Sequence, residues 1–78
     1  MPPEKRFLIS FGAAVRVRRE HLGMSQEKVA LAAELDRTYL GGVERGERNL
    51  GLINVGRLAV ALQTTPADLL SGIVLGDT

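Results

Sequence analysis

The sequence of 78 residues contains no cysteine, no tryptophan, two phenylalanines and one tyrosine. Without cysteine the chain can form no disulfide bond and no thiolate site for zinc, which excludes a zinc finger and suits a reducing cytoplasm. With so few aromatic side chains, the core must be built from Leu, Val, Ile and Ala, and such a core favours helices over short strands. The expected fold is therefore all-α, in a single domain over residues 1–78.

The sequence also has no segment typical of export or of a membrane span. No apolar run approaches the roughly 20 residues that a membrane-spanning helix needs. The apolar stretch near the N-terminus is short and leads into Arg16, Arg18 and Arg19, which is unlike a signal peptide. We therefore expect a cytoplasmic protein with no membrane partner.

Groups that could carry catalysis are missing as well. His21 is the only histidine, and no second histidine or serine nucleophile stands at a known motif spacing from it. The chain has no glycine-rich phosphate loop, no paired catalytic carboxylates and no cluster of metal ligands. We therefore expect no enzyme activity, no cofactor and no bound metal.

The charge is unevenly distributed. Residues 1–57 hold all ten Lys and Arg, whereas residues 58–78 carry only Asp68 and Asp77. The first part is therefore suited to facing a polyanion, while the C-terminal part is suited to another role.

Apolar spacing and capping residues predict the first three helices. From about residue 6, apolar side chains recur at helical spacing until Gly23 ends the first helix, and residues 1–5 are expected to be frayed. Ser25 is the expected cap of a second helix of about nine residues. Asp36 is the expected cap of a third helix, which ends at Gly46.

Two further helices complete the expected fold. Residues 52–62 place their apolar side chains on one helical face. Thr65 as a cap, followed by Pro66 at the first position, predicts a short fifth helix through Leu70. The third helix has an unusual feature, because its two internal glycines at 41 and 42 should each cost about 1 kcal/mol relative to alanine.

Residues 25–45 have the pattern of a helix-turn-helix, and the third helix begins with Arg37, Thr38 and Tyr39. If this helix enters a DNA major groove, the planar donors of Arg37 match the guanine atoms O6 and N7 exposed there. Such a pairing is worth about 1–3 kcal/mol of base discrimination. Thr38 can offer a methyl to thymine, and Tyr39 can contact a base step or a phosphate. The structural alternatives are a solvated arginine, a secondary cap at Thr38 and a tyrosine partly buried against the second helix.

A second set of residues is expected to bind DNA phosphates. Ser25 and Gln26 stand at the N-terminus of the second helix, where free N–H groups and the helix dipole favour an anion. Arg45, Arg48 and Asn49 stand at the end of the third helix and in the loop after it. The alternatives are simple capping for the first pair and an ordinary polar loop for the other three.

Three strings in this order resemble the lambda-repressor-like (XRE-type) helix-turn-helix family. Residues 22–26 resemble the junction of its first two helices, residues 43–46 the end of its recognition helix, and residues 66–70 its closing helix. The resemblance covers roughly residues 11–72 and implies a compact five-helix DNA-binding domain.

Further strings, at residues 35–39, 42–45 and 48–50, are similar to controller proteins of restriction–modification systems. This similarity implies a small homodimer that binds operators upstream of its own gene and of restriction–modification genes. The family resemblance also implies an ion pair between Arg19 and Glu44 that ties the first helix to the third. At Gly42 the chain departs from many relatives, which carry a base-reading side chain there. Either its backbone approaches DNA closely, or reading is confined to the helix start and depends on DNA shape.

A single recognition helix contacts too few base pairs for specific binding, and helix-turn-helix proteins therefore pair on two half-sites. The chain has more apolar residues at its C-terminal end than one small core needs, which predicts a dimerisation region over about residues 52–75. Its candidate members are Leu52, Ile53, Val60, Leu69, Leu70, Ile73, Val74 and Leu75. The alternative is that some of them, Leu69 among these, close the core of the monomer.

The predicted function is therefore a sequence-specific transcriptional regulator that binds double-stranded DNA as a homodimer. RNA polymerase is a further partner to consider for such a regulator. The alternative is an antitoxin or phage-type repressor of the same fold that acts mainly through a protein partner. In that case the C-terminal apolar residues would meet a different protein.

Overall fold

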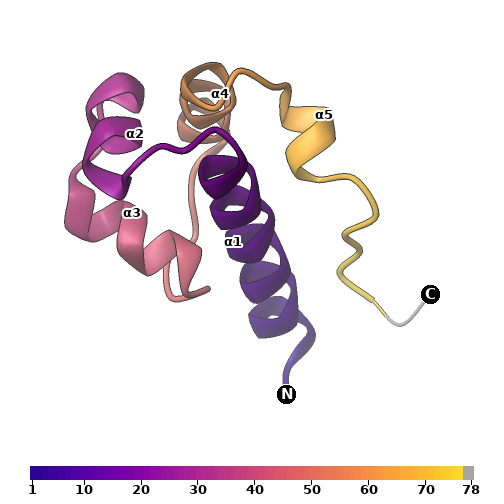
Figure 1. Cartoon of the computed structure of the whole chain (residues 1–78). Helices are drawn as coiled ribbons and strands as arrows, with labels where there is room; N and C mark the ends of the chain where they lie inside the picture. Colours follow the sequence, from indigo (N-terminus) through magenta and orange to yellow (C-terminus); the bar gives the residue numbers. More distant parts are fainter. Residues whose placement is uncertain (77–78) are drawn as a thin grey trace.

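Five helices follow one another along the chain in a computed structural model that describes residues 1–76 (Figure 1). The last two residues of the predicted domain, Asp77 included, lie outside the described residues. The helices are α1 (Pro3–His21), α2 (Gln26–Ala33), α3 (Arg37–Glu44), α4 (Leu52–Ala61) and α5 (Pro66–Leu69).

Side-chain caps start three of these helices as the sequence predicts. The Ser25 hydroxyl accepts a hydrogen bond from the Lys28 backbone N–H at 3.1 Å, at the start of α2. The Asp36 carboxylate accepts from the N–H of Thr38 at 3.2 Å, at the start of α3. Thr65 caps α5 in the same way. These bonds satisfy backbone donors that have no partner within the helix.

The prediction of a frayed start was wrong. The first helix begins at Pro3 rather than near residue 6. Proline suits the first helical position because it has no N–H to leave unpaired, and Glu4 in the first turn complements the helix dipole. The Lys5 ammonium group also donates to the Gly46 carbonyl at 3.0 Å, which ties this first turn to the end of α3.

The core lies where α1 packs against α3 and α5, and where α2 packs against α3 and α4. In Figure 1, α1 stands between the α2–α3 pair on one side and α5 on the other. The largest fully buried side chains are Leu40, Leu58, Leu62, Val15, Val29 and Val43. They come from α1, α2, α3 and α4, and Leu62 is the residue directly after α4. The helix-turn-helix therefore shares one core with α1 and α4.

Two contacts fix α1 against its neighbours. A Cβ atom on Gly12 would lie only 2.6 Å from the Glu44 carbonyl oxygen, so the backbones of α1 and α3 are in direct contact there. Farther along α1, the Arg18 guanidinium donates to the carbonyls of Leu62 at 2.9 Å and Gln63 at 3.0 Å. Arg18 therefore caps the C-terminal end of α4, where the helix dipole favours a cation.

Leu69 requires a correction, because it was predicted as a member of the dimerisation region. The structure places it in the core of the monomer, where it is 3% exposed. Leu69 stands four residues after the cap Thr65, on the side of α5 that packs on α1 and α4. Leu70 and Ile73 are half-buried against the same core.

Candidate nucleic-acid interface

The two faces of α3 differ in character. Leu40 and Val43 point into the core and are fully buried. Arg37 and Thr38 are both exposed. Helical spacing places Thr38 opposite Leu40 and Val43, and it places Arg37 on the flank between the two sides. Because Asp36 caps the helix just before them, the start of α3 is well ordered and presents both side chains outward.

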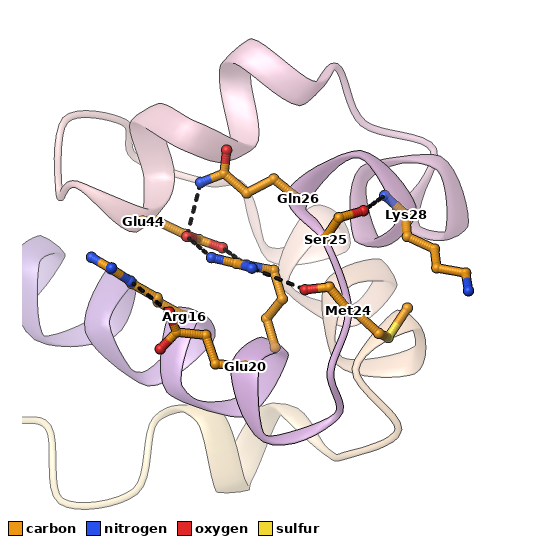
Figure 2. Close-up of polar contacts among 8 residues, drawn as sticks. Arg16, Glu20, Met24, Ser25, Gln26, Lys28 and Glu44 are labelled. Atoms are coloured by element: carbon orange, nitrogen blue, oxygen red, sulfur yellow. Dashed lines mark hydrogen bonds and ion pairs between the residues drawn. The ribbon is translucent and has the colours of Figure 1, made fainter.

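A polar network joins the C-terminal end of α3 to α1 and α2 (Figure 2). The Arg19 guanidinium donates to both carboxylate oxygens of Glu44, with Nε–Oε2 at 2.7 Å and Nη2–Oε1 at 3.1 Å. Its Nη1 donates to the Met24 carbonyl at 2.9 Å, and the Gln26 amide donates to Glu44 Oε1 at 3.0 Å. The structure thus contains the Arg19–Glu44 pair that the family resemblance implies.

This network is nearly closed to solvent. The side chains of Arg19 and Glu44 are 13% and 3% exposed. The hydrogen bond to Glu44 raises the pKa of Arg19 above its ordinary value, so this guanidinium keeps its charge. No buried side-chain polar atom among residues 1–76 lacks a hydrogen-bond partner. A buried pair of this kind fixes an orientation more than it adds net stability, and here it fixes α3 relative to α1.

Three of the five candidate phosphate ligands, Gln26, Arg45 and Arg48, lie beside the glycines of α3. A Cβ atom on Gly41 would lie 3.2 Å from Arg45 Nη1 and 3.6 Å from Gln26 Oε1, so these two side chains flank Gly41. The Arg45 guanidinium also pairs with Glu47 at 3.1 Å on the exposed surface. The side chain of Arg48 lies over Gly42.

Tyr39 and Ser25 have structural contacts in addition to their candidate roles. The tyrosine ring is half-buried against the core, and its hydroxyl donates to the Asn49 carbonyl at 3.4 Å. The Ser25 hydroxyl caps α2, so its acceptor capacity is used partly within the protein. The Asn49 side chain is exposed.

Arg37 and Arg48 differ from the other arginines of the described chain. Within residues 1–76, they alone among the arginines have no hydrogen-bond or ion-pair partner. Both lie at the outward side of α3, one at its start and one over Gly42. Two unpaired guanidinium groups on one helix face make a site suited to an anionic partner with hydrogen-bond acceptors.

Sequence reasoning missed two basic residues that position this site. Lys5 holds the end of α3, and Arg18 holds the end of α4. Both donate to backbone carbonyls at helix C-termini that are distant in the sequence. For Lys5, the proline and glutamate just before it were the available signal for an ordered helix start.

The predicted dimerisation residues divide into two groups. Leu52, Ile53 and Val60 on α4 are each more than 70% exposed, and Val74 and Leu75 are more than half exposed. Leu69 belongs to the monomer core, and Leu70 and Ile73 pack against that core while remaining partly exposed. The most exposed residues of the predicted dimerisation region therefore lie on the outer side of α4.

The described residues lack the features of two other classes of site. Among residues 1–76, no group of three or more His, Cys, Asp and Glu could hold a metal ion. None of the helices in this range has the length and hydropathy that crossing a bilayer requires.

A family model for the helix-turn-helix domain matches residues 15–69, which is more than half of the chain. The chain belongs to the helix-turn-helix family. The match includes α2 and α3 completely, together with the C-terminal part of α1 that carries Arg19.

Proteins similar to this helix-turn-helix chain include controllers of restriction–modification systems. Control protein C.BamHI of Bacillus amyloliquefaciens is 43% identical over 68 residues, which cover 86% of this chain and 84% of that protein. The restriction–modification controller C.AhdI from Aeromonas hydrophila, known from a crystal structure, shares 48% sequence identity with this chain. Its structure superposes with a TM-score of 0.78 over 80% of this chain and 94% of that one.

A third similar protein, the controller C.Esp1396I, has been solved as a tetramer in complex with its natural 35 base-pair operator. It is 28% identical to this chain with a TM-score of 0.77, covering 86% of this chain and 88% of that one. Together these comparisons confirm the predicted five-helix helix-turn-helix fold and the predicted similarity to controller proteins.

Proposed function

We propose that this protein is a sequence-specific DNA-binding transcriptional regulator of the controller type. It binds operators upstream of its own gene and of restriction–modification genes. The observation that carries the proposal is the pair of unpartnered guanidinium groups, Arg37 and Arg48, on the outward side of a capped α3. The similarity to control proteins along most of both chains supports the same function.

Base reading is assigned to the start of α3. Arg37 is exposed there and can donate two hydrogen bonds to guanine in the major groove. Thr38 stands beside it, with its backbone N–H occupied by the cap and its side chain exposed. Tyr39 presents only part of its ring, so its contribution is a contact at the groove edge.

Phosphate binding is assigned to the residues on either side of α3. Gln26 has a second N–H proton on Nε2 that the bond to Glu44 leaves available, and α2 begins at this residue. Arg48 and Asn49 are exposed in the loop after α3, and Arg45 shares its charge with Glu47. Ser25 contributes through the N-terminus of α2 that it caps.

The working form is a homodimer built on the outer side of α4. Leu52, Ile53 and Val60 are apolar and highly exposed in the monomer, and two copies would remove them from water. A twofold dimer places two α3 helices on half-sites about one helical turn apart, roughly 34–36 Å. The apolar outer side of α4, and not the arginine-bearing α3, is then the surface that faces the second copy.

Other aspects of the function follow from this assignment. We assign the whole of residues 1–78 to one domain, expect it to act in the cytoplasm and ascribe no enzymatic activity to it. RNA polymerase is a partner in the case that the regulator activates transcription. The alternative function, an antitoxin or phage-type repressor, would use the same exposed residues of α4 against a different protein.

A binding experiment tests the proposal. The purified protein is titrated against labelled DNA from its own upstream region and against a scrambled duplex of equal length, at several salt concentrations. We expect preferred binding to the upstream DNA that weakens steeply with salt, and a footprint with two half-sites. Equal affinity for the two duplexes at every salt concentration would contradict a sequence-specific regulator and favour the protein-partner alternative.

A further inference from the structure

The loop that follows α3 folds back along the outward side of this helix. It begins with a glycine turn in which the Gly46 N–H donates to the Val43 carbonyl at 3.0 Å and the Glu47 N–H donates to the Gly42 carbonyl at 2.8 Å. Three residues after Gly46, the Asn49 carbonyl accepts the hydrogen bond from Tyr39. The backbone on both sides of residue 48 is therefore fixed against α3.

Because of this loop conformation, the side chain of Arg48 lies across α3 at Gly42, which has no side chain. A Cβ atom built on Gly42 would lie 2.8 Å from Arg48 Cγ, 3.4 Å from Nε and 3.7 Å from Cδ. The first distance is shorter than carbon atoms tolerate, so any side chain at position 42 would displace the stem of Arg48. Gly42 is buried although it belongs to the outward side of the helix, because Arg48 covers it.

Glycine at position 42 lowers the stability of α3 as a helix. Glycine in a helix interior is less favourable than alanine, and α3 has only eight residues to support its own structure. Its φ angle does not require glycine, since the residues of the chain with positive φ are elsewhere. The close passage of Arg48 is the feature of the structure that an alanine at position 42 would not allow.

We propose that Gly42 is a positioning residue for DNA binding, which acts by letting Arg48 lie flat along α3. The inference rests on the proposed function, in which Arg48 binds DNA. With Gly42 in place, the guanidinium is held at the outward surface of α3 before DNA arrives, so less side-chain freedom is lost on binding. This explains the missing side chain at position 42, since Arg48 from the loop occupies the space that such a side chain would fill.

A double-mutant cycle tests this role. The affinity for operator DNA and the melting temperature are measured for the wild type, Gly42→Ala, Arg48→Ala and the double variant. We expect Gly42→Ala to weaken binding about tenfold, because an operator-bound dimer contains two copies of the perturbed contact. Its melting temperature should stay equal or rise, since alanine is the better helix former. In the Arg48→Ala background, the same substitution should change affinity less than about twofold.

Gly41→Ala is the matched control, because it adds the same methyl group one residue earlier on the same helix. Its Cβ would meet Arg45 and Gln26 and would not meet Arg48. Whatever its effect on affinity, that effect should be the same with and without Arg48.

Two results would overturn the inference. If Gly42→Ala weakened binding equally in the presence and absence of Arg48, the methyl group would act on DNA or on α3 itself. If Arg48→Ala left affinity unchanged while Arg37→Ala abolished it, Arg48 would have no DNA contact to position, although the proposed function would stand. Absence of specific binding by the wild type would instead be the failure of the proposed function.

Discussion

Replacing Glu44 by alanine removes the acceptor at the centre of the network that joins α1, α2 and α3. This carboxylate accepts two hydrogen bonds from Arg19 and one from Gln26, and its side chain is almost completely buried. After the substitution, Arg19 would keep its charge in a largely enclosed site, since its guanidinium does not lose a proton at accessible pH. The Met24 carbonyl would remain as its hydrogen-bond acceptor, and Glu20 would remain as a nearby negative charge.

The expected cost can be estimated from this geometry. Removing one partner of a buried ion pair typically destabilises a protein by about 3–5 kcal/mol. Because Arg19 keeps one carbonyl and some access to water, we expect the lower end, about 3 kcal/mol. At about 4–8 °C per kcal/mol for a domain of this size, the melting temperature should fall by at least about 12 °C. Such a loss is a large fraction of the stability of a small domain.

Urea unfolding at one fixed protein concentration measures this effect, since dimer stability depends on concentration. Glu20→Ala is the matched control, because Glu20 pairs with Arg16 on the exposed surface of α1. We expect it to cost about 0.5 kcal/mol or less. The double variant Arg19→Met, Glu44→Leu should lie closer to the wild type than Glu44→Ala, because it leaves no unpaired charge. If Glu44→Ala lowered operator affinity and left the unfolding free energy unchanged, the structural assignment of this pair would be wrong.

Three further variants probe other parts of the molecule. Val60→Glu should weaken the dimer by about 3–6 kcal/mol, because each of the two copies loses the burial of one valine. Sedimentation that shows an unchanged dimer would contradict the assignment of α4 to the dimer interface. Arg37→Ala should cost about 1–3 kcal/mol of discrimination between the operator and one with the contacted guanine replaced, whereas the exposed Arg16→Ala should retain full discrimination in the same titration. Glu34→Gly should raise the unfolding free energy by about 1 kcal/mol, since Glu34 ends α2 at φ 58° in the left-handed region; a decrease in denaturation experiments would refute this reasoning.

Local signals in the sequence predicted most of the fold. Ser25, Asp36 and Thr65 all act as caps, because capping depends on residues two or three positions apart. Counting apolar residues was less reliable. It showed that the C-terminal region has more apolar residues than one core needs, but it did not show which of them belong to the core. Leu69 was predicted in the dimerisation region with the monomer core as the alternative, and the packing of α5 on α1 and α4 decides for the core.

The contacts that shape the candidate site could not be predicted from local patterns. Arg19 and Glu44 are 25 positions apart, and only the resemblance to a known family placed them together. The passage of Arg48 over Gly42 depends on the path of the loop after α3, which has no periodicity from which to derive it. The sequence showed that Gly42 lacked a side chain, but the residue that fills the space became apparent only in the structure.

The recognition helix is too short to be stable alone. It has eight residues, two of them glycines that together cost about 2 kcal/mol, whereas isolated helices need about 12–15 residues even with favourable composition. Its order must therefore come from tertiary contacts, chiefly the Gly12 backbone contact, the Glu44 network and the packing of Leu40.

These stabilising contacts are on the inner side of α3, while the candidate DNA ligands Arg37 and Arg48 are on its outer side. Substitutions on the inner side should consequently lower stability and operator affinity together, because both depend on an ordered α3. Substitutions of the two outer arginines should lower affinity alone. A series in which loss of affinity followed loss of stability for Arg37 and Arg48 as closely as for Leu40 would show that the two sides of α3 are not separable in this way.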